Sequence, residues 1–163
     1  MITQARVREA LSYDPETGVF TNRVRSGSRR GPGDRAGSLT ATGYWQIMID
    51  YKVYQQHRLA YLYMTGEWPE HEIDHIDGDR ANNRWSNLRD ATRLQNGRNR
   101  CRSRNNASGM KGVCFDLTRC RWRAGITVGG KYVNLGYFAS PEEAHAAYCA
   151  AADKHYGEFA RHG

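Results

Sequence analysis

The feature that most restricts the fold is a pair of alternating segments, joined by two glycines and followed by a helix. Apolar and polar residues alternate over 121–128, RWRAGITV, and again over 131–138, KYVNLGYF. A period of two residues is typical of strands that bury one face, and Gly129-Gly130 suits a two-residue hairpin turn. Residues 140–143, SPEE, are a capping box with proline at the first helical position. The order predicts two antiparallel strands and a helix.

Residues around this pattern complete a sheet-plus-helix unit. We expect another strand at 110–116, which makes three, and a helix that runs to about Tyr156 with small residues toward the sheet. The opposite sheet face would be polar and basic. Such a face can enter the major groove of DNA, although exposed arginines on a strand are also common on a solvated surface.

The run from 72 to 99, EIDHIDGDRANNRWSNLRDATRLQNGRN, predicts a hairpin followed by a helix. Residues 72–76 read as a strand, 87–90 as the return strand, and Thr92 as the N-cap of the helix. The loop between the strands is rich in Asp and Asn, which favour turns. In this arrangement the end of the first strand and one face of the helix can meet at one point.

The chemistry available at that point is limited by its residue types. Asp74 and Asn96 offer hard oxygen ligands, which suit Mg²⁺, Ca²⁺ or Mn²⁺ better than Zn²⁺. A neutral His75 beside the ion can take a proton from water. The alternative is an ordinary loop of turn-forming residues with a half-exposed histidine. We interpret the loop residues Asp77, Asp79, Asn82 and Asn83 as turn formers rather than ligands.

The motif DHIDGDRANNRWSNLR followed by LQNGRNR resembles the HNH (ββα-metal) nucleases, specifically the phage and intron-encoded homing endonucleases, over about residues 56–100. The resemblance implies that His75 is the general base, that Asp74 and Asn96 hold the metal, and that Asn87 orients His75. Asn96 stands where many members carry a second histidine, so we expect one divalent cation, Mg²⁺ foremost, and no structural zinc.

The segment from about residue 108 to 161 resembles the plant ethylene-response-factor (Apetala-type) DNA-binding domain, through KGV, LGYF and the helix PEEAHAAYCAAADKHYG. The chain departs from that family at Cys114, Gly125 and Thr127, where charged readers are common. The DNA contacts implied by the resemblance are Lys111, Arg121, Arg123, Tyr132 and Asn134. The linker adds four arginines that we expect to follow phosphates, Arg98, Arg100, Arg102 and Arg104.

The residues before the motif predict a scaffold for the nuclease part. We expect a helix at 3–11, a turn at 13–18, a strand at 19–24, a hairpin at 43–56 and a helix at 57–65. His57 opens that last helix, and we interpret it as a packing or capping histidine before a DNA contact.

Net charge and chain length limit the kinds of protein that this sequence can encode. The 163 residues carry a net charge of +7, which favours a polyanionic partner, and four scattered cysteines are expected to be reduced thiols. We expect an α+β protein with a nuclease domain at 1–100, a basic linker at 101–109 and a sheet-plus-helix DNA-binding domain at 110–163. We also expect a cytoplasmic location in a bacterial host, without secretion or a membrane, and a monomer or weak dimer.

The function predicted from these features is a metal-dependent endonuclease for double-stranded DNA, of the phage or mobile-element homing type, that nicks one strand. No small-molecule cofactor is expected. One alternative is a DNA-binding regulator whose nuclease module is inactive, and a weaker one is an RNA-binding protein.

Overall fold

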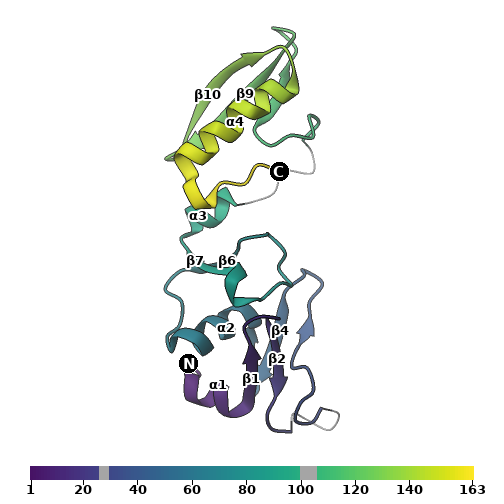
Figure 1. Cartoon of the computed structure of the whole chain (residues 1–163), viewed down its shortest axis with the longest axis vertical. Helices are drawn as coiled ribbons and strands as arrows, with labels where there is room; N and C mark the ends of the chain where they lie inside the picture. Colours follow the sequence, from purple (N-terminus) through teal and green to yellow (C-terminus); the bar gives the residue numbers. More distant parts are fainter. Residues whose placement is uncertain (26–29, 100–105) are drawn as a thin grey trace. The chain divides into compact units, whose positions relative to one another are not determined.

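The structure is a computed structural model that describes residues 1–25, 30–99 and 106–163 (Figure 1). The chain divides into an N-terminal unit, Met1–Arg93, and a C-terminal unit, Leu94–Gly163. The domain limits expected from the sequence, with a linker at 101–109, remain a prediction.

The N-terminal unit begins with a short helix and a hairpin. Helix α1, Gln4–Ala10, starts at Thr3, whose side chain accepts from the Arg6 amide, as the sequence predicts. Strands β1, Leu11–Asp14, and β2, Val19–Asn22, pair antiparallel. The sequence did not predict β1, because Leu11 was expected in the helix, and Tyr13 and Asp14 in the turn.

A second sheet and a helix follow. Strands β3, Ser38–Leu39, β4, Trp45–Ile49, and β5, Lys52–Gln55, form an antiparallel sheet in that order. The predicted β4–β5 turn is present, with Asp50 and Tyr51 at φ 50° and 61°. Helix α2, Gln56–Thr65, ends at Gly66 in the left-handed conformation.

The motif region forms the expected strand, loop and return strand. Strand β6, Glu72–His75, pairs antiparallel with β7, Leu88–Ala91. Asn87 falls in a 3₁₀ turn, Trp85–Asn87, just before β7, rather than in the strand itself. Helix α3, Arg93–Arg98, follows and crosses the boundary between the units.

One apolar core joins these elements of the N-terminal unit. Burying a large apolar side chain stabilises a fold by about 1.5–3 kcal/mol, so a few such residues decide the packing of short strands. The core therefore holds α1, α2, the β1–β2 hairpin and the β4–β5 hairpin around the start of β6. Its members include Val7, Leu11, Phe20, Ile47, Leu59, Leu62, Ile73 and Leu88.

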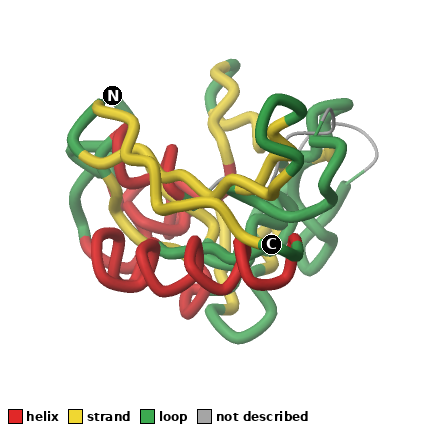
Figure 2. Tube along the Cα trace, turned by 90° about the horizontal axis from the view of Figure 1, so that it is seen from above, coloured by secondary structure: helices red, strands yellow, loops and turns green. Residues whose placement is uncertain are grey.

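The C-terminal unit contains the predicted three-stranded antiparallel sheet, with the predicted helix along it (Figures 1 and 2). Its β9, Arg121–Val128, β10, Lys131–Phe138, and α4, Pro141–Tyr156, have the predicted limits, and β8, Val113–Asp116, begins three residues later than expected. The side chain of Ser140 accepts from the Glu143 amide, which is the predicted cap. Buried side chains between helix and sheet include Val113, Ala124, Ile126, Ala144, Tyr148 and Ala152.

Candidate active site

His75, the predicted base, is the last residue of β6, and a residue of the following loop contacts its ring. Its Nε2 lies 3.1 Å from Oδ1 of Asn83, and only 6% of the residue is exposed. Nδ2 of Asn83 donates to the carbonyl of Ala81 at 3.4 Å, so Oδ1 is the atom that faces the ring. Nε2 then carries the proton, and Nδ1 is the basic nitrogen of the imidazole.

Asn83 is itself fixed by the N-terminal hairpin. It is 1% exposed, and its carbonyl accepts from the Tyr13 hydroxyl at 2.7 Å. Gly18 packs so closely on the Asn83 backbone that a Cβ at Gly18 would overlap it. Gln56 of α2 in turn donates to the Gly18 carbonyl at 2.6 Å. The position of the His75 ring therefore depends on β1, β2 and α2.

Asn87 has a different contact from the one implied by the resemblance. Its Oδ1 accepts from the Asp77 amide at 3.0 Å, and its Nδ2 donates to Asp77 Oδ1 at 3.0 Å and to the Asn82 carbonyl at 2.8 Å. These bonds close the β6–β7 loop. The contact with the His75 ring comes from Asn83, which the sequence left among the turn formers because nothing in its spacing separates it from Asn82.

A group of rings covers the inner side of His75. The His57 ring lies edge-on at 5.1 Å between centroids, and Tyr44 lies at 6.1 Å. His57 is buried, as expected for a packing residue, but it packs against the candidate base. Burial lowers the pKa of His57 to about 3, with smaller contributions from the charges of His75 and Arg58, so this ring is neutral at working pH.

Asp74, the predicted metal ligand, forms an ion pair within the hairpin. It lies directly opposite Arg89 in the β6–β7 register. Arg89 donates to Asp74 Oδ2 from Nε at 2.9 Å and from the second guanidinium nitrogen at 2.7 Å. The two side chains are 5% and 14% exposed, so the pair is nearly buried. Nothing in the residue spacing had suggested a role for Arg89.

Asn96, the second predicted ligand, lies on α3 within the C-terminal unit, whereas Asp74 belongs to the N-terminal unit. Their joint binding of one ion therefore stays a prediction. The donor set suits the expected ion, because a carboxylate and an amide oxygen are hard ligands that leave positions for water and phosphate. Across the described ranges, no group of three or more His, Cys, Asp or Glu residues could hold a metal ion.

The outer face of the C-terminal sheet carries four of the predicted DNA contacts. Helix α4 packs on the face that contains Ala124 and Ile126, so their strand neighbours point the other way. Tyr132 crosses this outer face over Gly125, where a Cβ would overlap its ring. The space that a charged reader would need at Gly125 is thus filled by Tyr132. The residues on this face are Cys114, Asp116, Arg121, Arg123, Gly125, Thr127, Tyr132, Asn134 and Tyr137.

The other predicted DNA contacts have different positions. Lys111 lies before β8, and its ammonium donates to the carbonyls of Arg98 and Arg161, both at 3.0 Å. The Arg98 guanidinium lies over the Tyr156 ring at 5.0 Å. Three predicted contacts lie outside the described residues, namely Arg100, Arg102 and Arg104.

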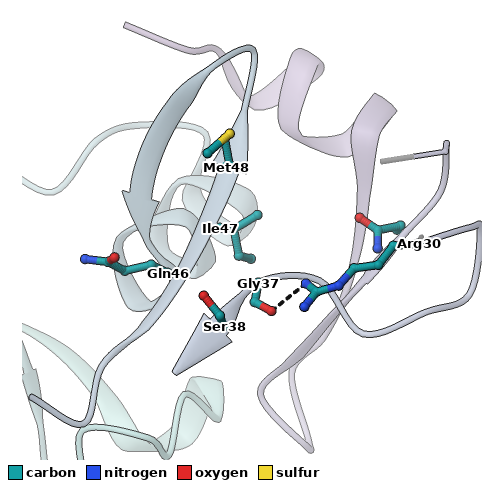
Figure 3. Close-up of a pocket in the computed structure, with 7 residues that line it drawn as sticks. Arg30, Gly37, Ser38, Gln46, Ile47 and Met48 are labelled. Atoms are coloured by element: carbon teal, nitrogen blue, oxygen red, sulfur yellow. Dashed lines mark hydrogen bonds between the residues drawn. The ribbon is translucent and has the colours of Figure 1, made fainter. Parts of the chain in front are cut away.

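The N-terminal unit also has a small pocket of about 130 Å³ beside β4 (Figure 3). Arg30 reaches across it and donates to the Gly37 carbonyl at 2.6 Å. None of its lining residues belongs to the predicted site. The lining residues are Asn22, Arg30, Gly37, Ser38, Gln46, Ile47 and Met48.

No helix in the described part of the chain has both the length and the apolar character needed to cross a membrane.

Comparisons with known proteins find a matching family for each of the two resemblances. Residues 54–98 match the family described as HNH endonuclease, and residues 108–158 match the AP2 domain. Over 86 residues the chain is 35% identical to protein 3.8 of Escherichia phage T7. The aligned region covers 52% of this chain and 71% of that protein. Over 124 residues it is 33% identical to a protein named an uncharacterized HNH endonuclease from Acanthamoeba polyphaga mimivirus, covering 75% of this chain and 63% of that protein.

The HNH match contains the whole β6–β7 hairpin with Asp74, His75 and Asn87, and the AP2 match contains the sheet and nearly all of α4. Both families point to DNA as the partner. The chain belongs to the HNH endonuclease family and carries an AP2 domain after its nuclease domain.

Proposed function

We propose that this protein is a divalent-metal-dependent endonuclease that hydrolyses one phosphodiester of double-stranded DNA at a preferred site. The observation that carries the proposal is the 3.1 Å contact between His75 Nε2 and Asn83 Oδ1, beside Asp74 in the HNH motif. It gives the imidazole one tautomer and one orientation, as a general base requires.

The chain's residues would act in the following way. Nδ1 of His75 takes a proton from a water molecule, whose oxygen forms a bond to the phosphorus while the bond to the leaving 3′-oxygen breaks. The resulting imidazolium keeps its Nε2–H bond to Asn83, which holds the ring through the step. Asp74 and Asn96 would hold the cation, which when bound supplies Lewis-acid stabilisation of negative charge on the phosphate and leaving oxygen.

The AP2 domain would place this site on DNA. Its outer sheet face carries Arg121, Arg123, Tyr132 and Asn134, and the basic residues from Arg98 to Arg104 would follow the phosphates. One active site cleaves one DNA strand at a time, so a single chain would nick the duplex. A double-strand break would require two chains, or two successive binding events by one chain. A role as a phage or mobile-element homing enzyme is part of the same proposal, as is a monomer or weak dimer.

The test is the conversion of supercoiled plasmid to open circles. The wild type is incubated with Mg²⁺, with Mn²⁺ and with a chelator. We expect nicking with either cation and none with the chelator. Retarded migration of a DNA duplex without any strand cleavage, under every metal tried, would instead favour the DNA-binding regulator. Stronger binding of structured RNA than of duplex DNA would favour the RNA-binding alternative.

A further inference from the structure

The ion pair between Asp74 and Arg89 affects how tightly the proposed nuclease site can bind its cation. Both residues lie in the β6–β7 hairpin, directly opposite one another, and two N–H groups of Arg89 converge on Oδ2 of Asp74. Both side chains are nearly buried, so water screens the pair weakly. The carboxylate that would bind the cation therefore already has its charge balanced by a guanidinium.

The other acidic side chains of the β6–β7 loop form hydrogen bonds within that loop. Asp77 lies in the same loop, but both of its oxygens accept from groups of the loop itself, the Asp79 amide and the side chains of Asn82 and Asn87. The other members of the proposed set are the His75 imidazole and the Asn96 amide, and neither is an acidic group. Asp74 is the one acidic residue of this set, so a divalent ion entering it would meet a single carboxylate, one negative charge short of balance, beside the positive charge of Arg89.

The DNA backbone can supply that missing charge. Each phosphate brings one negative charge and oxygen ligands of the kind that Mg²⁺ prefers. We propose that Arg89 is a positioning residue that makes cation binding depend on DNA, so that the ion is held tightly only together with a phosphate. The inference rests on the proposed nuclease function. Because such coupling is reciprocal, the cation should strengthen DNA binding by the same factor.

The expected consequence is a protein that binds its cation weakly when alone. In solution without DNA, Arg89 opposes the ion, and on DNA the phosphate offsets it. Replacing Arg89 by a neutral residue leaves Asp74 as an unbalanced buried carboxylate, for which a cation is the natural partner. Replacing it by lysine keeps the positive charge but not the two converging N–H groups.

The direct test titrates Mn²⁺ into the full-length protein without DNA and measures free Mn²⁺ by electron paramagnetic resonance. We expect Arg89→Gln to bind Mn²⁺ about tenfold more tightly than the wild type, within the range typical of coupling between sites. Arg89→Lys should resemble the wild type. The double variant Asp74→Asn with Arg89→Gln should lose the gain, which would identify Asp74 as the ligand. An Arg89→Gln protein that stays folded yet binds Mn²⁺ no more tightly than the wild type would overturn the proposal.

A second measurement keeps the proposal testable if Arg89→Gln does not fold. The His75→Ala protein, chosen to prevent cleavage, is titrated with Mn²⁺ with and without a 30-base-pair duplex, after subtraction of the ion bound by the duplex alone. We expect about tenfold tighter binding with DNA, and equal affinities would refute the coupling. The plasmid assay separates this from the proposed function: a wild type that nicks plasmid but shows no coupling removes only the role of Arg89, whereas a wild type that never nicks removes the nuclease.

Discussion

At the scale of single residues, the two asparagines of the β6–β7 loop have separate tasks. Asn83 contacts the His75 ring, and Asn87 ties together Asp77 and Asn82. We predict that Asn83→Ala lowers the nicking rate by about 10–100-fold, the usual cost of removing a group that orients an active side chain. The rate is measured on supercoiled plasmid under single-turnover conditions.

The matched comparison is Asn87→Ala. It removes three hydrogen bonds of the loop, two of them to Asp77, so we expect a loss of unfolding free energy of about 1–3 kcal/mol in urea titrations. Equal losses of rate in both variants, with equal losses of stability, would contradict the division of tasks.

His57 gives a pH dependence of stability. Its folded-state pKa is about 3 because the ring is buried, whereas the unfolded value is near 6.5. Between these values the unfolded chain binds one more proton than the folded chain, so stability is full above pH 6.5 and falls as the pH decreases toward 3. Well inside the range between these two pKa values, the free energy of unfolding should change by about 1.4 kcal/mol per pH unit.

The measurement is the free energy of unfolding in urea between pH 7.5 and 5, where most carboxylates stay ionised. His57→Phe, which keeps a ring against His75, should lose this slope. The half-exposed His71, paired with Asp90, supplies the control variant His71→Phe, for which the slope should remain. If the free energy of unfolding of His57→Phe kept the same pH dependence, a group other than His57 would be the one that takes up the proton on unfolding.

At the scale of elements, the regular patterns predicted the fold well. The alternation in β9 and β10 and the cap at Ser140 gave strands and a helix with the observed limits, because each signal is local. Strand β1 was missed because its four residues follow a helix directly and owe their strand conformation to pairing with β2. Pairing of that kind depends on distant residues and leaves no periodic signal.

The candidate site was predictable in its residue types but not in its contacts. Asp74 and His75 could be proposed from one motif. The contacts of Asn83 and Arg89 come from the path of a loop and the register of a hairpin, with Asp74 opposite Arg89. Neither the loop path nor the register can be read from one sequence, because several asparagines and arginines in the motif offer the same chemistry.

The outer sheet face yields an element-scale prediction. Tyr132 lies over Gly125, so Gly125→Ala would force the exposed end of this ring to move and should cost about 0.5–1 kcal/mol of stability, as a displaced rotamer does. In a Tyr132→Ala background the same change should cost much less. The cost is measured by chemical unfolding of the four proteins of the cycle. Equal costs in the two backgrounds would show that the ring does not rest on Gly125 in solution.

At the scale of the whole molecule, DNA affinity should depend on the sheet face that α4 leaves open. We predict that Arg121→Ala with Arg123→Ala weakens duplex binding and lowers the slope of log affinity against log salt by about 1 for each phosphate that the protein no longer neutralises. Lys154→Ala is the matched control, because Lys154 lies on α4, which packs on the opposite face. Fluorescence anisotropy across a salt series gives both quantities, and an unchanged slope in the double variant would remove this face from the interface.

The most direct measurement compares the wild type with His75→Ala in both plasmid nicking and duplex binding, with Mg²⁺ present. If an imidazole on β6 takes the proton from the attacking water, the variant should bind DNA with wild-type affinity and lose nicking by at least about a hundredfold. Nicking at the wild-type rate by a folded His75→Ala protein would contradict the central claim.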